Sequence, residues 1–335
     1  MKKSPRLLLF VLLACINRSV FAQTTTIRGF VDVNTIVEKS KVSFNLGEQD
    51  LFINSELNDR FSFLGESVFK FSLSSPTTFD VSIERIVLKY NLAGNHNLLF
   101  GKHHTPINYW NDTYHHGKVF FPTVGRPLLF EDNFIPLHTT GIGMQAMNLG
   151  NIRFGYDLLV GNGIGSNDFV DNDKAKSITA AVHIKPTEHL RIGASVYHDK
   201  ISAGAKLHDG HVLQKEVKQN LLTGSVSYFG TMFEFLSEST FARNHTDSTA
   251  NQYSTALYAY AGVKIKEKFV PYVRFDYIHY GDGEVFFEKN NATSIMGGIR
   301  YIINYLAVVK LEYQRQDRTA TGVTDRLSAQ VAIGF

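Results

Sequence analysis

The sequence predicts an all-β protein, a transmembrane antiparallel β-barrel of about sixteen strands, within a range of roughly 14 to 18 strands. Three observations carry this prediction. The chain begins with an export signal, its side chains alternate between polar and apolar over most of its length, and short connections alternate with longer ones. Together they indicate a sheet that has one apolar face and closes on itself within a membrane.

The first 22 residues have the three parts of a secretory signal peptide. Basic residues come first, an apolar run from Leu7 to Ile16 follows, and Ala22 precedes the expected cleavage site. The apolar run is too short to cross a bilayer as a helix. An alternative cleavage before Cys15 would leave a lipidated N-terminus, but a barrel needs no lipid anchor. We therefore expect residues 23–335 to form one barrel domain.

The composition of the remaining chain excludes several other classes of protein. The signal removes four of the 34 basic residues, which leaves 30 against 31 acidic ones and a net charge of about −1. This charge predicts no nucleic-acid partner. Cys15 is the only cysteine, so its loss excludes a disulfide framework and any thiolate metal site. No later stretch approaches the length of an apolar membrane helix.

The clearest alternation lies at the C-terminus, in residues 326–335. Leu327 and Val331 fall on one face of an extended chain, whereas Arg326 and Gln330 fall on the other. The chain ends on Phe335, and a terminal aromatic residue in such a strand resembles the assembly signal of bacterial outer-membrane proteins. The resemblance implies recognition by the barrel-assembly machinery and a location in the outer membrane of a Gram-negative cell envelope.

The same alternation recurs between turn signals and predicts sixteen strands, each long enough to cross a bilayer when tilted. They are expected at 27–37, 41–54, 60–73, 77–91, 96–102, 139–149, 151–161, 175–185, 189–199, 216–228, 231–242, 251–265, 268–279, 291–303, 305–315 and 325–335. In the fourth strand the apolar positions change phase between Ile83 and Ile86, which predicts a β-bulge near Glu84. Whether the side chain of Arg85 lies on the apolar or the polar face of the strand is therefore left open.

Charged side chains occur repeatedly on the face opposite the apolar one, and a barrel turns this face to its lumen. The residues expected to face the lumen are Glu66, Lys70, Arg191, Arg274, Asp276, Lys310, Glu312 and Arg326. The alternative for this set is structural ion pairing across the barrel wall. Several tyrosines, Tyr272 among them, are expected instead at the membrane interface.

The longest connection, residues 103–138, follows the fifth strand and is the third outer loop if the N-terminus is periplasmic. Long loops without secondary structure of their own are usually functional. Sixteen strands with an elongated third outer loop resemble the general bacterial porins, in which this loop folds into the lumen and narrows it. The resemblance implies a pore constriction formed by Lys102, His103, His104, Asp112, His115, His116, Lys118, Arg126, Glu131 and Asp132. The alternative is a lid packed on the rim.

The resemblance also implies a homotrimer. A more distant similarity is to the phosphate-selective porins, but that branch has dense arginines and lysines where this loop carries histidines. Such histidines raise the alternative of a metal site, with His103, His104, His115, His116 and His138 as candidate ligands. Adjacent residues in a strand point to opposite faces, however, so the spacing favours imidazoles that line the pore and titrate there.

The expected function is passive diffusion of small hydrophilic solutes or ions through a barrel embedded in outer-membrane lipid, with no cofactor and no covalent chemistry. The first alternative is an outer-membrane enzyme such as a lipase or protease, yet serine and histidine residues occur here without a recognisable catalytic motif. The second is a non-conducting barrel that serves adhesion or envelope structure. Conductance separates these functions.

Overall fold

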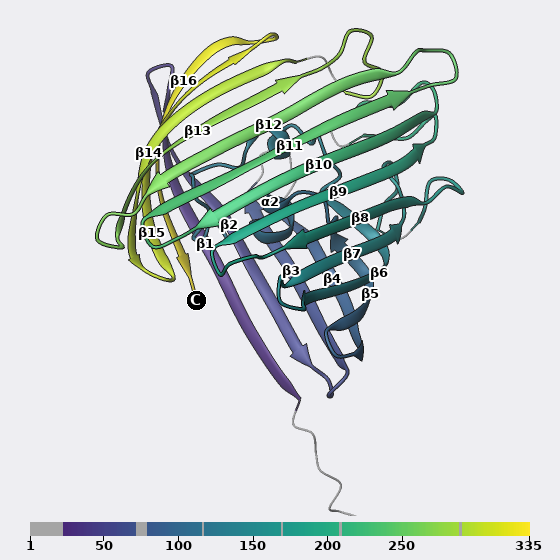
Figure 1. Ribbon diagram of the computed structural model, residues 1–335. Helices are drawn as coiled ribbons and strands as arrows, with labels where there is room; N and C mark the ends of the chain where they lie inside the picture. Colours follow the sequence, from purple (N-terminus) through teal and green to yellow (C-terminus); the bar gives the residue numbers. More distant parts are fainter. Residues whose placement is uncertain (1–22, 72–78, 116, 169, 208–209, 288–289) are drawn as a thin grey trace, which may run out of the picture.

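The computed structural model describes residues 23–71, 79–115, 117–168, 170–207, 210–287 and 290–335. The predicted signal peptide and His116 lie outside these residues. Sixteen antiparallel strands close into one barrel, in which each strand pairs with the next along the chain and β16 pairs with β1 (Figure 1). None of the helices in the described ranges has the length and apolar character needed to cross a bilayer.

The strands confirm the predicted fold class, and each predicted strand is present with its ends shifted by at most a few residues. They are β1 Thr24–Glu38, β2 Lys41–Glu56, β3 Phe61–Phe71, β4 Phe79–Ala93, β5 His96–His104, β6 His138–Leu149, β7 Phe154–Gly161, β8 Ser177–Ile184, β9 Leu190–Ile201, β10 Val217–Phe229, β11 Phe233–His245, β12 Gln252–Val263, β13 Phe269–His279, β14 Ala292–Asn304, β15 Ala307–Arg318 and β16 Gly322–Gly334. Two short helices, α2 Tyr109–Thr113 and α3 Leu128–Glu131, lie between β5 and β6.

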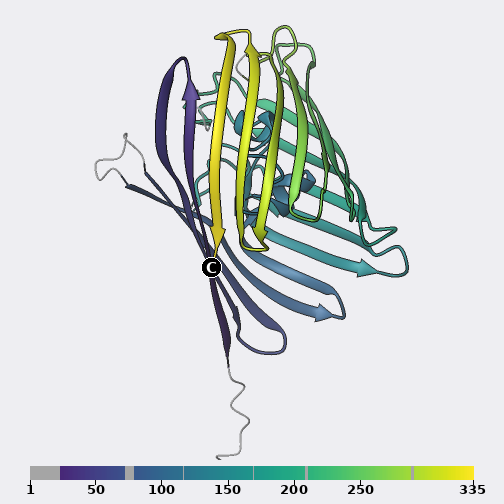
Figure 2. The same cartoon turned by 90° about the vertical axis from the view of Figure 1, so that its left-hand side faces the viewer.

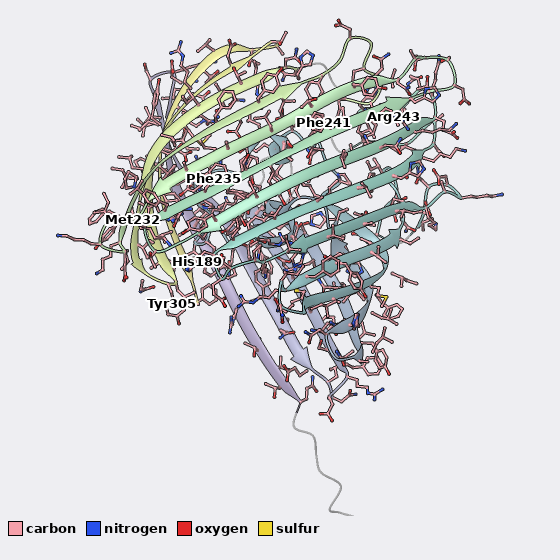
Figure 3. All side chains as sticks on the ribbon, viewed as in Figure 1. His189, Met232, Phe235, Phe241, Arg243 and Tyr305 are labelled. Atoms are coloured by element: carbon pink, nitrogen blue, oxygen red, sulfur yellow. The ribbon has the colours of Figure 1, made fainter. Side chains whose placement is uncertain are left out.

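The alternation of side chains gives the barrel an apolar exterior. On β13, Val273 is 58% exposed, whereas the next residue, Arg274, is 2% exposed because it points inward. Phe235 and Phe241 on β11 likewise lie on the outer surface (Figure 3). A closed sheet with this much exposed apolar surface suits hydrocarbon rather than water.

The predicted β-bulge near Glu84 is confirmed. Arg85 pairs with Glu66 and Ile83 with Ser67, so Glu84 is an extra residue between two consecutive pairs. Ile83 is 46% exposed and Ile86 is 47% exposed, which places both on the outer surface and turns the two residues between them inward. The bulge therefore delivers a carboxylate and a guanidinium side by side to the lumen.

The pairing of strands in the barrel wall is less regular between β2 and β3. Pairing between these strands runs from Glu48 with Lys70 to Glu56 with Ser62, so among the described residues 41–46 pair only with β1. Figure 2 shows the β1–β2 hairpin rising beside β16 while β3 and β4 diverge from it. The closing seam between β1 and β16 is regular, from Phe30 with Gly334 to Glu38 with Arg326.

Candidate pore and its internal loop

The third outer loop, residues 105–137, lies inside the barrel and is named here the internal loop. Its helix α2 lies within the ring of strands in Figure 1. The indole of Trp110 on α2 is buried, and its ring lies 5.9 Å from that of Tyr258 on β12. The alternative of a lid on the rim therefore does not hold for the described part of this loop, which follows the inward course that the resemblance implies.

The loop was expected to lack secondary structure, and the two helices correct that expectation. Each helix begins at a carboxylate of the barrel wall. Glu238 accepts hydrogen bonds from the backbone N–H groups of Tyr109 at 2.5 Å and Trp110 at 2.9 Å. Asp276 accepts one from Leu128 at 3.1 Å. Carboxylates at these positions satisfy amides that the first turn of a helix leaves unpaired.

An apolar cluster fills the side of the lumen next to β9–β14. The internal loop contributes Ile107, Trp110, Phe121, Leu128, Leu129, Phe130, Phe134 and Ile135, which pack with wall residues such as Leu236, Ala256, Tyr258 and Tyr260. Burial raises the pKa of Tyr114 at the edge of this cluster, so its phenol stays neutral. The loop and this part of the wall thus share one hydrophobic core.

Tyr272 belongs to the same interior, so its predicted position at the membrane interface is wrong. Its side chain is buried, and its hydroxyl donates a hydrogen bond of 2.8 Å to Glu312. The aromatic residue type suggested an interfacial position, but its alternation with Val273 places it on the lumen side.

Arg274 shows what the predicted lumen charges do. Its guanidinium lies 3.0 Å from Asp276 and donates to the carbonyl groups of Gly125 at 2.8 Å and Arg126 at 2.9 Å. Its remaining contact is the hydroxyl of Thr123 at 2.5 Å. The charge therefore faces the lumen, as expected, but it binds the internal loop instead of open water.

β14 and β15 hold the next part of the loop in the same way. The ammonium group of Lys310 donates to the carbonyls of Lys118 at 2.7 Å and Thr123 at 2.9 Å. Glu312 accepts the N–H of Val124 at 3.1 Å. Arg300, which the sequence analysis missed, donates to the carbonyl of Pro122 at 3.2 Å and pairs with Glu234.

The other predicted lumen residues also point inward. Lys70 pairs with Glu48 at 3.2 Å, and Arg326 pairs with Glu38 at 3.0 Å. Glu66 is buried and pairs with Arg85. Arg191 reaches the loop, since it lies 3.4 Å from Asp112 and 4.8 Å from the centre of the Tyr109 ring. The missed lumen charges Asp32, Asp50, Glu84, Glu234, Glu238 and Arg300 are buried on the same face. Alternation with apolar neighbours was the signal that could have found them, except for Glu84, whose signal was the change of phase at the bulge.

The space left by the internal loop lies mainly on the β1–β6 and β14–β16 side, as an outer cavity of about 1240 Å³. Lys102, Lys118, Arg126, Glu131 and Asp132 line it together with Glu48, Lys70, Arg318 and Arg326. Some of these charges are paired: Lys118 lies 3.4 Å from Asp32, Lys102 lies 3.0 Å from Asp168, and Arg318 lies 2.8 Å from Asp132. The cavity is therefore polar and carries both signs of charge.

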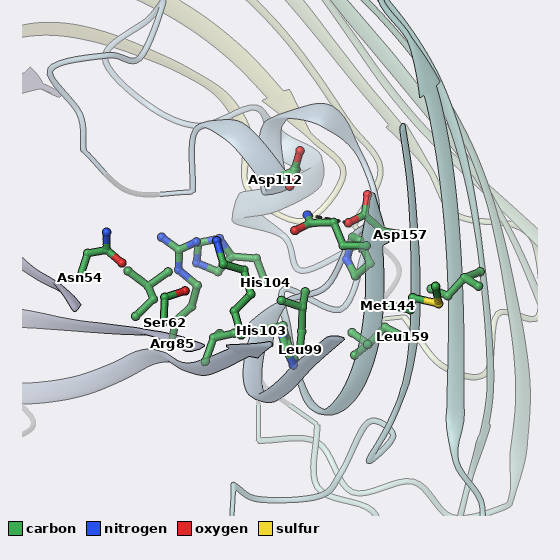
Figure 4. Close-up of a pocket in the computed structure, with 17 residues that line it drawn as sticks. Asn54, Ser62, Arg85, Leu99, His103, His104, Asp112, Met144, Asp157 and Leu159 are labelled. Atoms are coloured by element: carbon green, nitrogen blue, oxygen red, sulfur yellow. Dashed lines mark hydrogen bonds between the residues drawn. The ribbon is translucent and has the colours of Figure 1, made fainter. Parts of the chain in front are cut away.

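A second, inner cavity of about 240 Å³ lies beyond the first. Figure 4 shows Arg85, His103, His104 and Asp157 among its lining residues, with Asp112 on the loop above them. The two cavities share no lining residue. What separates them is a thin layer of side chains in which His104 faces the inner cavity, while His115, His138 and Glu84 face the outer one.

The imidazoles of His104, His115 and His138, named here the histidine cluster, come together in this layer. Their candidate ligand atoms all lie within 4.8 Å of one another. The rings of His104 and His115 stack at 3.8 Å, and those of His115 and His138 meet edge to face at 4.5 Å. His103 is buried beside them but is not part of the cluster, and His116 lies outside the described residues.

Sixteen antiparallel strands around an inward third loop define a class of protein, the sixteen-stranded outer-membrane porins, and this chain has their fold. An anion-selective porin from Comamonas acidovorans has a TM-score of 0.67 at 11% identity, and the match covers 93% of this chain and 100% of that one. The trimer form of OmpT, an outer membrane protein of Vibrio cholerae, has a TM-score of 0.66 at 14% identity, and the match covers 94% of this chain and 100% of that one. OmpF of Salmonella typhi in complex with daunomycin has a TM-score of 0.64 at 11% identity, and the match covers 93% of this chain and 97% of that one. No protein-family model and no curated protein sequence matches the chain.

Proposed function

We propose that the protein is an outer-membrane channel through which small hydrophilic solutes or ions diffuse passively. The observation that carries this proposal is the outer cavity of about 1240 Å³, which is lined by charges of both signs and leads to the histidine cluster. The internal loop occupies the opposite side of the lumen, so it confines passage mainly to the side formed by β1–β6 and β14–β16. Rings of charged side chains in such a position select solutes by charge and width.

The constriction in this proposal is the layer between the two cavities. Glu66, Arg85 and Glu84 come from the wall, and the histidine cluster comes from β5, β6 and the loop. Together with the charges that line the outer cavity, these side chains are the ones that a passing solute meets. The neighbouring folds support this proposal, since two of them are described as an anion-selective porin and as a trimer.

The same proposal includes export and assembly. We infer that residues 1–22 are removed, that Phe335 takes part in assembly in the outer membrane, and that three copies associate. The mature N-terminus tests the first point: Edman sequencing should begin at Gln23, whereas a lipid-modified Cys15 would overturn the cleavage site. Chemical cross-linking in the membrane tests the trimer.

Planar-bilayer recording tests conduction directly. The refolded protein should produce stepwise, ohmic currents in potassium chloride. A matched preparation denatured before addition is the control, because it contains the same polypeptide and detergent. A barrel that inserts but stays silent at every voltage would overturn the channel proposal and favour adhesion or hydrolysis as the function.

A further inference from the structure

The histidine cluster combines residues that are far apart in the sequence. His104 ends β5, His138 begins β6, and His115 follows α2 on the internal loop. Glu84 joins them through the β-bulge, with its carboxylate 2.8 Å from Nε2 of His138 and 3.8 Å from Nε2 of His115. Three imidazoles thus converge, with one carboxylate beside two of them, and this is a typical donor set for a divalent transition metal.

The orientation of His115 is fixed by Asn111, one turn earlier on the loop. The amide nitrogen of Asn111 donates to the carbonyls of Thr105 at 2.9 Å and Leu137 at 3.0 Å. Its amide oxygen must therefore accept the hydrogen bond of 2.7 Å that joins it to Nδ1 of His115. A neutral His115 then carries its proton on Nδ1, so that the lone pair of Nε2 points toward Glu84. Hydrogen bonds of this kind hold imidazole ligands at metal sites.

This tautomer places two acceptors, Nε2 of His115 and the carboxylate of Glu84, 3.8 Å apart. A cation between them would bridge the two. A second carboxylate lies at the other side of the cluster, where Glu66 is 3.5 Å from Nε2 of His104. Oε1 of Glu66 is buried and makes no hydrogen bond with any described residue. Two cations lie close by, where Arg85 pairs with Glu66 and Arg126 donates to the carbonyl of His115.

We propose that the histidine cluster and the carboxylate of Glu84 form a binding site for a divalent transition-metal ion, with Zn²⁺ as the probe. In a tetrahedral zinc site the ligand nitrogens lie roughly 3.3 Å apart, because the Zn–N bonds are about 2.0–2.1 Å long. The ligand nitrogens of the three histidines lie within 4.8 Å of one another, so rotations of the side chains bring them to that spacing. For the metal to bind, the imidazole of His104 rotates away from its stacked position against the imidazole of His115.

The position of this site also has a consequence for conduction, and this consequence rests on the proposed channel. The cluster lies between the outer and inner cavities, so a bound ion closes the remaining path and fastens the internal loop to β4, β5 and β6. Zinc should therefore block the conductance reversibly, and EDTA should restore it.

Calorimetry on the full refolded barrel tests the site without any reference to conduction. We expect one Zn²⁺ per chain and no binding of Mg²⁺, which prefers oxygen ligands. His115→Ala and Glu84→Gln should each weaken zinc binding about tenfold or more, as the loss of a ligand does. His103→Ala is the matched control, because this buried neighbour lies outside the cluster and its loss should leave zinc affinity unchanged.

Resistance of each variant to unfolding in cold detergent shows that it has folded. Glu84→Gln keeps the size of the side chain, so it remains informative if His115→Ala does not fold. A wild-type barrel that binds no zinc, or an affinity equal in the wild type and both cluster variants, would overturn the site. Zinc binding by a barrel that never conducts would instead overturn the proposed channel and leave the site standing.

Discussion

At the scale of single residues, the lumen charges behave as buried groups. Moving a guanidinium out of water costs several kcal/mol unless the protein replaces the lost hydrogen bonds. Arg274 donates hydrogen bonds to Asp276 and to three oxygen atoms of the internal loop, and Lys310 donates to two loop carbonyls. These cations are therefore structural, and the loop is the partner that makes their burial acceptable.

Arg274→Met should destabilise the barrel by about 3–5 kcal/mol, because it leaves Asp276 buried without its cation. Urea unfolding in lipid vesicles measures the change. Arg315→Met is the matched control, since the side chain of Arg315 is 55% exposed and pairs with the exposed Asp325. Its loss should cost less than about 1 kcal/mol. Equal losses in the two variants would show that the loop contacts of Arg274 contribute nothing.

The sequence predicts on which side of the barrel wall such side chains lie, but not which residues they contact. Alternation places Arg274, Asp276, Lys310 and Glu312 on the lumen side because it is a local property of a strand. The spacing of the histidines along the chain did not predict which of them meet. The cluster takes one ring from each of the two neighbouring pairs and a third from His138. Only the course of the loop brings these rings together.

At the scale of elements, the internal loop carries a natural reporter, because Trp110 is the only tryptophan of the chain. Its indole is buried among Phe121, Phe130 and Tyr258. In the folded wild type we expect blue-shifted emission and weak quenching by iodide. Red-shifted, freely quenched emission would mean that the loop lies outside the barrel in solution.

Glu238→Ala should raise the iodide quenching of Trp110 several-fold, since it removes the acceptor of two loop amides and of the Tyr258 hydroxyl. Glu216→Ala is the matched control. Its carboxylate pairs with Lys200 at 3.0 Å, away from the loop. Unchanged quenching in a folded Glu238→Ala barrel would show that the apolar cluster alone seats the loop.

The two kinds of element differ in how far the sequence predicts them. Each strand was found because its polarity repeats every second residue, which needs no knowledge of distant parts of the chain. Helices α2 and α3 were missed because they are too short to show a helical period. They also begin at carboxylates that follow more than a hundred residues later, Glu238 and Asp276. Their stability therefore comes from tertiary contacts.

At the scale of the whole molecule, closure brings the last residue against the first strand. The backbone of Phe335 exchanges hydrogen bonds of 2.8 and 2.9 Å with Gly29. The ring of Phe335 covers Gly29, where a Cβ atom would lie 2.3 Å from the ring and clash with it. The end of the chain thus completes the seam in addition to the assembly role predicted for it.

Deletion of Phe335 should lower the amount of folded protein in the outer membrane several-fold, because both the predicted assembly signal and two seam hydrogen bonds are lost. Refolding of the purified chain in detergent should change less, since the other pairs between β1 and β16 remain. Phe335→Tyr is the control that keeps an aromatic ring. Normal outer-membrane levels of the shortened chain would exclude the assembly role.

The contacts of Arg274 and Lys310 with the internal loop limit how this barrel can be re-engineered. In an open channel, water would surround both cations; here the peptide oxygens of residues 118–126 perform that task. A foreign third loop of equal length would fail unless its own peptide oxygens fell at the same points. Loop and wall therefore have to be transplanted as a single unit, whatever solute the new pore is meant to carry.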